Sequence, residues 1–188
     1  MAEVLLFHHA QGQTAGFLAF ADELRAAGHT VHIPDLYDGK TFAALDDGVG
    51  YAKQVGFDTL LERGERAADG LPAELVYAGF SLGVMPAQKL AQTRPGAKGA
   101  LLFHATFPTE EFGGAWPAGV PVQIHTMDDD DWGDVDVARE FAGTIESAEL
   151  FLYPGSQHLF ADNSLGDYDE EAASVLMKRV LAFLEAIE

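Results

Sequence analysis

The stretch Gly79-Phe80-Ser81-Leu82-Gly83 carries most of the information in this chain. It follows the apolar run Leu75–Ala78, which predicts a buried strand, and it leads into a helical pattern that begins near Leu82. A serine with glycine two residues away on either side fits a sharp turn from a strand into a helix, because such a turn leaves no room for larger neighbours. The pattern therefore predicts that the hydroxyl of Ser81 is exposed at the end of a strand.

An acid and a base follow that serine at the ends of two later strands. Asp128–Asp131 come after a predicted strand at Val120–Thr126, and His158 lies in a loop after a predicted strand at Glu149–Tyr153. The order serine, aspartate, histidine is typical of α/β-hydrolases, in which the serine attacks, the histidine transfers the proton and the carboxylate orients the imidazole. Spacing alone leaves open which of the four aspartates would be the acid.

Strand and helix patterns alternate along the whole chain. The expected strands are Val4–Phe7, Thr30–Ile33, Leu75–Ala78, Gly99–His104, Val120–Thr126 and Glu149–Tyr153. The expected helices are Ala15–Ala27, one or two within Phe42–Asp69, Leu82–Thr93, Val135–Thr144 and Tyr168–Ile187, with Ala105–Gly119 as a long loop. Near-continuous apolar strands separated by helices are typical of a parallel sheet covered on both faces. We expect a single α/β domain over residues 1–188, with a mostly parallel six-stranded sheet.

Composition narrows the possible partners. The chain has 188 residues, no cysteine and a formal net charge of −19, so a thiol nucleophile is excluded and nucleic acid or anionic lipid would be repelled. No apolar stretch approaches the ~18 residues of a membrane span, and no basic region precedes the first strand as in a signal peptide. We expect a cytoplasmic monomer or homodimer that acts on a small molecule, with an acidic surface that reflects either solubility or a halophilic habitat.

The chemistry of acyl transfer suggests further site residues. The oxyanion of a tetrahedral intermediate needs two backbone N–H donors, which we assign to Leu82, directly after the serine, and to Ala10, in the loop after the first strand. Side chains expected near the carboxyl edge of the sheet are candidates for the wall of a substrate pocket, although core packing explains each of them equally well. These candidates are His9, Tyr37, Phe107, Phe112 and Trp116.

The chain resembles the dienelactone hydrolase family over nearly its full length. The segments that carry the resemblance are His8–Gly12, Pro34–Tyr37, Gly79–Gly83 and Tyr153–Phe160. The resemblance implies a compact α/β-hydrolase fold in which the usual N-terminal antiparallel strands are reduced or absent. It also points to Asp130 as the catalytic acid, because Asp131-Trp132 stand where the family has a proline and an aromatic residue. Asp128 is the reserve candidate.

Three departures from the family's prototype bear on the substrate. Ser81 replaces a cysteine nucleophile, and His9 replaces a glutamate in the first loop. The arginines that hold the prototype's carboxylate substrate are replaced by Asp38/Gly39 and by Asp162, and the six arginines of this chain fall on predicted helices away from the site. Only Lys40 could supply a cation there. We therefore expect an uncharged ester, lactone or thioester as substrate, and no cofactor.

Two alternatives remain open at the level of sequence. A metal-dependent hydrolase could use histidines near strand ends together with the aspartates of Asp128–Asp131, although no compact metal-binding spacing is present. The histidines in question are His8, His9, His104 and His125. A non-catalytic binding protein could keep the fold without turnover, since a fold does not imply a function.

Overall fold

The computed structural model describes residues 1–187, and within them six strands form one sheet in the order β2-β1-β3-β4-β5-β6. The strands are β1 (Glu3–Phe7), β2 (Thr30–His32), β3 (Val76–Phe80), β4 (Gly99–Phe103), β5 (Val122–Met127) and β6 (Ala148–Tyr153). All five pairings between neighbours are parallel. The predicted α/β class and six-stranded parallel sheet are confirmed.

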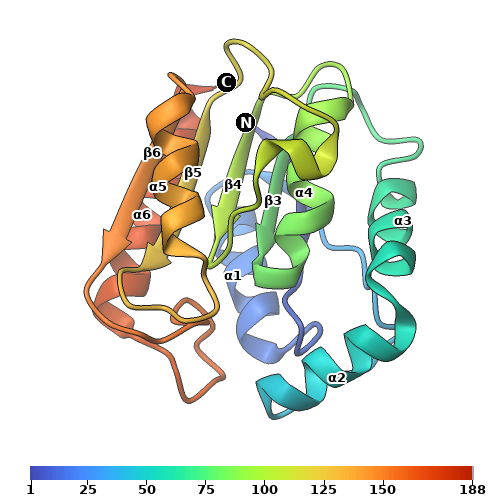
Figure 1. Cartoon of the computed structure of the whole chain (residues 1–188), viewed down its shortest axis with the longest axis vertical. Helices are drawn as coiled ribbons and strands as arrows, with labels where there is room; N and C mark the ends of the chain where they lie inside the picture. The colour runs from blue at the N-terminus through green and yellow to red at the C-terminus, as the bar shows by residue number, and fades with distance from the viewer. Residues whose placement is uncertain (188) are drawn as a thin grey trace.

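Helices cover both faces of this sheet (Figure 1). They are α1 (Ala15–Ala26), α2 (Leu45–Val55), α3 (Phe57–Ala67), α4 (Val84–Thr93), α5 (Val135–Thr144) and α6 (Glu170–Ala186). In Figure 1, α3, α4 and α5 lie in front of the sheet and α1 and α6 behind it, while α2 lies near the ends of the strands. Since parallel strands need crossover connections, this distribution follows from the connectivity.

Alternation along each strand divides the core into two clusters. In β1, Leu5 and Phe7 pack with α3, α4 and α5, whereas Val4 and Leu6 pack with α1 and α6. Successive side chains of a strand point to opposite faces, so one short apolar run supplies both clusters. This is why the strands of this chain read as continuous hydrophobic runs rather than as alternating ones.

The structure shifts some predicted boundaries. β3 continues to Phe80, two residues beyond the prediction, and Ser81–Gly83 form a 3-10 turn before α4 begins. The last helix begins at Glu170 rather than Tyr168, because Asp169 is its N-cap and accepts a hydrogen bond from the Ala172 N–H at 3.0 Å. The predicted loop Ala105–Gly119 contains a short 3-10 helix at Thr109–Phe112.

The strand order fixes where a ligand can bind. The chain moves from β1 outward to β2, and then crosses to β3 on the other side of β1. Loops after β1 and β3 therefore leave the sheet in opposite directions and open a crevice at its carboxyl edge. None of the helices described has the length and apolar character needed to cross a bilayer.

Candidate active site

The turn after β3 holds Ser81 in a conformation that few residues adopt. Its φ is +50°, in the left-handed region that is uncommon for a residue with a side chain. A Cβ on Gly79 would collide with the Gly83 carbonyl, and a Cβ on Gly83 would collide with the Phe7 carbonyl of β1. Both glycines are therefore required by close backbone contacts, and they let the turn after β3 lie directly against the end of β1.

Two hydrogen bonds connect Ser81, His158 and Asp130. The Ser81 Oγ lies 2.7 Å from His158 Nε2, and His158 Nδ1 lies 2.8 Å from Asp130 Oδ2. His158 is almost fully buried, and the Asp130 side chain is inaccessible to solvent. The other carboxylate oxygen of Asp130 accepts the Trp132 N–H at 2.9 Å. The structure thus places the three predicted catalytic side chains in one connected arrangement.

The remaining aspartates of the cluster lie elsewhere. Asp128, the reserve candidate for the acid, is exposed, and its carboxylate accepts the Gly155 N–H at 3.0 Å. Asp129 and Asp131 are exposed as well. Gly133 leaves the space that Asp130 needs, because a Cβ there would press against both the Asp130 carboxylate and the Thr126 hydroxyl. Asp130 is the only one of the four that contacts His158.

The loop after β1, which carries Ala10, is held from several sides. The Gln11 side chain donates to the Phe42 and Ala43 carbonyls at 3.1 Å each, and the Phe42 N–H donates back to the Gln11 carbonyl at 2.9 Å. Gly48 of α2 lies against this loop so closely that a Cβ would collide with the Ala10 carbonyl. A loop fixed in this way can present an N–H group without rearrangement, which is what a preorganised oxyanion site requires.

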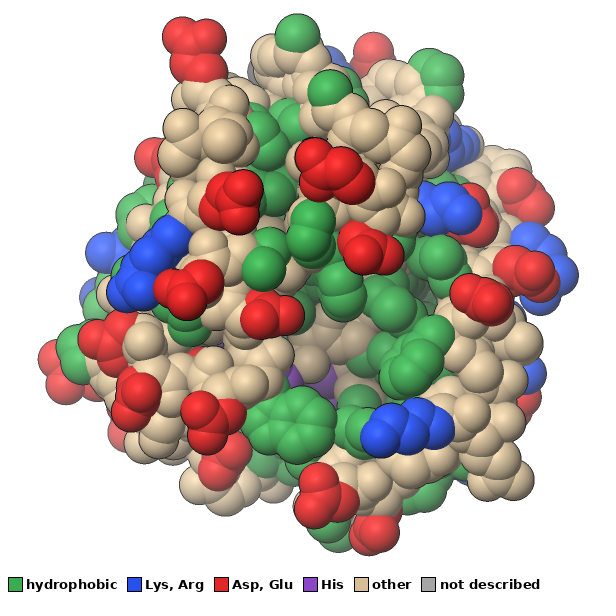
Figure 2. Space-filling view, in the orientation of Figure 1, with side chains coloured by type: hydrophobic (Ala, Val, Ile, Leu, Met, Phe, Trp, Pro, Cys, Tyr) green, Lys and Arg blue, Asp and Glu red, His purple; other side chains and the backbone are tan. Residues whose placement is uncertain are grey.

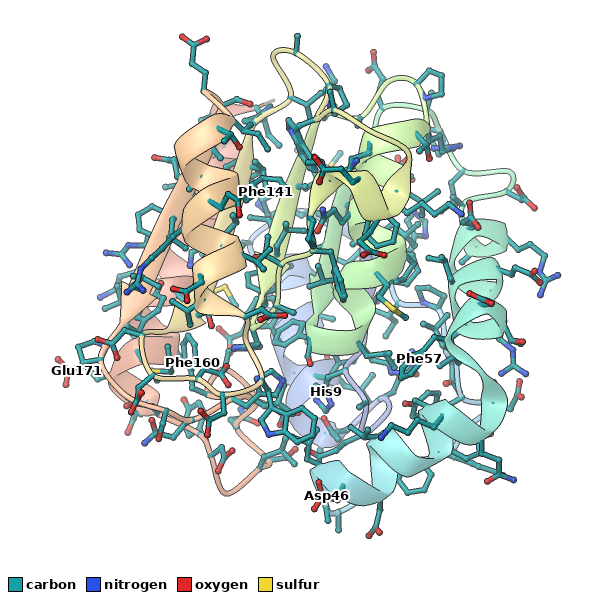
Figure 3. The ribbon with its side chains drawn as sticks, viewed as in Figure 1. His9, Asp46, Phe57, Phe141, Phe160 and Glu171 are labelled. Atoms are coloured by element: carbon teal, nitrogen blue, oxygen red, sulfur yellow. The ribbon has the colours of Figure 1, made fainter. Side chains whose placement is uncertain are left out.

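His9 forms a second buried pair beside the first. Its Nδ1 accepts the Gln11 N–H at 3.1 Å, which leaves Nε2 as the donor to Asp162 Oδ2 at 2.8 Å. The Thr14 hydroxyl and both the N–H and hydroxyl of Ser164 also donate to the Asp162 carboxylate. Burial alone would raise the pKa of Asp162, but these hydrogen bonds outweigh it and lower the pKa to about 2. His9, predicted to line the pocket, is fully buried and joins two loops of the site instead (Figure 3).

The other candidate pocket residues divide into two groups. Tyr37 is fully buried against His8 and Tyr51, and its hydroxyl donates to the Gly48 carbonyl at 3.3 Å, so it is a core residue rather than a pocket wall. Trp116 is also buried, donates its indole N–H to the Val120 carbonyl at 2.8 Å and packs on Phe141 of α5. These two predicted positions are corrected accordingly.

Phe107 and Phe112 pack on one another at 5.7 Å between ring centres. Phe107 is half-buried, and Gln88 of α4 fixes its backbone on both sides, accepting its N–H at 3.1 Å and donating to its carbonyl at 2.8 Å. Trp132, which the sequence analysis did not propose for the pocket, is 52% exposed and lies 6.2 Å from the His158 ring. Figure 2 shows a hollow with a histidine at its base and hydrophobic side chains around it.

The cations nearest the loop after β2 are engaged with neighbouring groups. The Lys40 ammonium lies 4.7 Å from the centre of the Tyr51 ring. Arg63 of α3 donates to the Leu36 carbonyl at 2.7 Å and pairs with Asp38 at 3.2 Å. The expectation that all arginines lie far from this segment is therefore wrong for Arg63, because a long side chain on α3 reaches back to it. No paired arginine clamp for a carboxylate is present among the described residues near Ser81.

The four histidines that the sequence analysis considered as metal ligands do not lie around one common site. His8 Nε2 accepts the Leu36 N–H at 2.9 Å, and burial lowers the pKa of His8 to about 4, which keeps it neutral. His125 lies 2.9 Å from the Tyr153 hydroxyl, and burial lowers its pKa to about 3. Burial likewise holds the pKa of His104 well below its usual value. Within residues 1–187, no three His, Asp or Glu side chains are placed to hold one metal ion.

The fold and the arrangement of Ser81, His158 and Asp130 define the class as an α/β-hydrolase. The chain belongs to the dienelactone hydrolase family, whose family model matches residues 1–188. No curated protein matches the sequence. Membership of the dienelactone hydrolase family makes this protein a carboxylic ester hydrolase.

Solved structures share the fold at low sequence identity. A putative dienelactone hydrolase from Klebsiella pneumoniae is 20% identical, with a TM-score of 0.74 and coverage of 98% of this chain and 87% of that one. A putative α/β hydrolase from Xanthomonas campestris is 19% identical, with a TM-score of 0.66 and 99% coverage of both chains. Esterase 2 of Thermogutta terrifontis, phosphonylated by cyclosarin, is 16% identical, with a TM-score of 0.71 and coverage of 99% and 83%.

Sequence reasoning missed the partner of His9. Asp162 was noted only because an arginine is absent from its position, yet it is the most densely hydrogen-bonded carboxylate at this edge of the sheet. One signal was available, since Asp162 directly follows the apolar run Leu159-Phe160-Ala161, and an aspartate in such a setting is buried only when it is paired.

Proposed function

We propose that this protein is a serine hydrolase that cleaves an uncharged carboxylic ester, lactone or thioester through an acyl-enzyme. The observation that carries the proposal is the continuous connection from Ser81 Oγ to His158 Nε2 at 2.7 Å and from His158 Nδ1 to Asp130 Oδ2 at 2.8 Å. Both distances are within the range in which a histidine can accept a proton from a serine while a carboxylate orients it.

In the acylation step, Ser81 Oγ attacks the carbonyl carbon and its proton moves to His158 Nε2. Asp130 accepts the Nδ1–H, so it selects the tautomer whose Nε2 is free to take that proton, and it stabilises the imidazolium that forms. The negative oxygen of the tetrahedral intermediate is bound by the N–H groups of Leu82 and Ala10. Collapse of the intermediate breaks the bond to the alcohol or thiol, which leaves with the proton from His158.

In the deacylation step, water enters in place of the leaving group. His158 takes a proton from the water, the resulting hydroxide adds to the acyl carbon, and the same two N–H groups bind the second oxyanion. Return of the proton to Ser81 Oγ releases the carboxylic acid and restores the enzyme.

The charges around the site support an uncharged substrate. The Asp162 carboxylate is fully buried and paired, Arg63 is bound to Asp38, and Lys40 lies over Tyr51. A substrate carboxylate would therefore meet no bidentate partner, and the net charge of −19 opposes its approach.

Replacement of the nucleophile tests the proposal. Ser81→Ala should abolish hydrolysis of p-nitrophenyl acetate and labelling by a fluorophosphonate, because no other group supplies the attacking oxygen. A fluorophosphonate suits this test, since a similar structure, the Thermogutta terrifontis esterase, is phosphonylated by an organophosphorus compound. Ser174→Ala on the exposed face of α6 is the matched control and should retain both activities.

Circular dichroism would establish that both variants fold. Unchanged turnover or unchanged labelling in a folded Ser81→Ala protein would contradict the assignment. Absence of labelling in the unmodified protein would favour a non-catalytic binding protein instead.

A further inference from the structure

Trp132 is a large apolar side chain that lies half-exposed beside the catalytic histidine. Its ring centre is 6.2 Å from that of His158, at an angle of 39° between the ring planes. Among the described residues, no cation lies over the indole, and its N–H donates to no other group. Trp116, by contrast, is buried and donates its indole N–H to the Val120 carbonyl. The mechanism proposed above gives the exposed indole of Trp132 no role.

The turn that orients the catalytic carboxylate also fixes the position of Trp132. The Trp132 N–H donates to Asp130 Oδ1 at 2.9 Å, and the Gly133 N–H donates to the Asp130 carbonyl at 3.2 Å. The second oxygen of the same carboxylate lies 2.8 Å from His158 Nδ1. The indole and the catalytic imidazole are therefore positioned by one side chain, and a binding surface that is held in place in this way costs little ordering when a ligand binds.

Trp132 lies on the solvent side of the catalytic histidine. The two rings next to His158 are His104, at 6.1 Å between ring centres, and Trp132, at 6.2 Å. His104 is fully buried, so a substrate cannot reach it, whereas Trp132 is exposed. Figure 2 shows hydrophobic side chains around the hollow that has a histidine at its base. Of the two rings beside His158, Trp132 is thus the one that a bound substrate can contact.

The direction of proton transfer decides which part of the substrate lies at Trp132. His158 Nε2, which is 2.7 Å from Ser81 Oγ, must give its proton to the oxygen of the departing alcohol. That oxygen therefore lies within hydrogen-bond reach of the imidazole, and the carbon groups attached to it come next to the neighbouring indole. The carbonyl oxygen is directed instead to the proposed donors, the N–H groups of Leu82 and Ala10.

The charges near Trp132 restrict the alcohol further. Its exposed neighbours along the chain include three carboxylates, from Asp129, Asp131 and Asp134. These carboxylates oppose an anionic group over the indole. An uncharged aromatic ring can instead cover the indole in an offset-stacked or edge-to-face arrangement, both of which are favourable.

We propose that Trp132 is a specificity-determining residue that binds the alcohol portion of the substrate, and that the preferred substrates are esters of uncharged aromatic alcohols. This proposal rests on the serine hydrolase function and adds to it the class of leaving group. Because the alcohol departs when the acyl-enzyme forms, Trp132 should affect acylation and leave deacylation unchanged. Its effect therefore belongs in kcat/KM, which reports the steps up to acylation.

The test compares methyl acetate, benzyl acetate and methyl phenylacetate with the full-length protein. The last two are isomers that carry the same ring on the alcohol side and on the acyl side, and methanol and benzyl alcohol are of similar acidity. Trp132→Ala should lower the benzyl acetate-to-methyl acetate ratio of kcat/KM about three- to tenfold. The methyl phenylacetate-to-methyl acetate ratio should keep its original value, because the acyl side does not contact the indole.

Two further variants and one further ester provide the controls. Trp132→Phe keeps a flat ring and should retain most of the preference for benzyl acetate. Tyr168→Ala removes another exposed aromatic ring, which lines a groove between α1 and α6, and should keep every ratio. Cyclohexylmethyl acetate has the bulk of benzyl acetate without its flat ring, so its reaction should respond less to Trp132→Ala.

Three results would overturn the proposal. The first is a benzyl acetate-to-methyl acetate ratio that Trp132→Ala leaves unchanged. The second is an equal loss for methyl phenylacetate, which would make the role of Trp132 structural or place it at the acyl side. The third is an equal loss for cyclohexylmethyl acetate, which would mean that the site selects bulk rather than aromatic alcohols. Failure of the serine hydrolase assignment is distinguishable from all three, because the original protein would then neither hydrolyse p-nitrophenyl acetate nor react with a fluorophosphonate.

Discussion

At the scale of single residues, Asp130 differs from its three acidic neighbours in surroundings rather than in chemistry. It is buried, faces the His158 ring and receives the Trp132 N–H on its second oxygen. Asp128 is exposed and bonded to Gly155. A carboxylate that determines the tautomer of a catalytic histidine must have both the contact and the burial, and only Asp130 has them.

This difference gives a paired prediction. Asp130→Asn should lower kcat for p-nitrophenyl acetate by about 10³–10⁴, because the amide can donate to Nδ1 and thereby stabilise the wrong tautomer of His158. Asp128→Asn should leave kcat close to that of the original protein, since an amide oxygen can still accept the Gly155 N–H. Steady-state kinetics on both purified variants provides the check, and the reverse ranking of the two would assign the acid to Asp128.

At the scale of secondary-structure elements, α2 supports the proposed oxyanion loop. Two of its glycines, Gly48 and Gly50, are two residues apart and have different environments. A Cβ at Gly48 would collide with the Ala10 carbonyl, whereas a Cβ at Gly50 would meet nothing within 4 Å. Helix α2 can approach the loop after β1 only because position 48 lacks a side chain.

Alanine substitutions at these two positions distinguish the effect of close packing against the loop from the effect of helix propensity. Gly50→Ala should stabilise the protein by about 0.5–1 kcal/mol, because alanine loses less backbone entropy in a helix than glycine does. Gly48→Ala should displace Ala10 and lower kcat by about 10²–10³, the usual loss when one oxyanion donor is misplaced. Chemical denaturation and acetate hydrolysis measure the two effects. Full activity in Gly48→Ala would show that the Ala10 N–H is not required.

At the scale of the whole molecule, the 30 acidic residues differ in how much each contributes to stability in acid. Asp162 connects the loops after β1 and β6 with the start of α1, through His9, Ser164 and Thr14. Its pKa of about 2 in the folded protein is below the ordinary value of 3.8. Between these values the unfolded chain binds more protons than the folded one, so the contribution of Asp162 is complete above pH ~4 and is lost as the pH falls toward 2.

The loss of stability at low pH tests whether the pKa of Asp162 is lowered in the folded protein. In urea denaturation from pH 6 to pH 2, the original protein should lose stability below pH 4, and Asp162→Asn should be less stable at pH 6 but vary less with pH. Glu110→Gln, at an exposed position, is the control for a change of one charge and should keep the original pH dependence. Parallel curves for the original protein and Asp162→Asn would show that the folded-state pKa of Asp162 is not lowered.

Much of the fold was predictable, because local patterns determine it. The helix Val135–Thr144 was predicted with its observed bounds, and every strand was predicted to within two residues at each end. Apolar runs, glycines and proline carry that information along the chain.

The errors concern side chains at the carboxyl edge: Tyr37 and His9 are buried, Trp116 lies along α5, and Arg63 reaches the loop after β2. Which way an aromatic or a long cationic side chain points depends on contacts from distant segments, and no local pattern encodes those.

The amino-acid sequence by itself determined the sheet, the turn at Ser81 and the chain order of the three site residues, because each depends on neighbours within a few positions. Only the tertiary structure decided that Asp130 rather than Asp128 faces His158 and that His9 pairs with Asp162. These results depend on side chains that are 28 and 153 residues apart in the chain. Their proximity follows from the order of the strands and the packing of the helices.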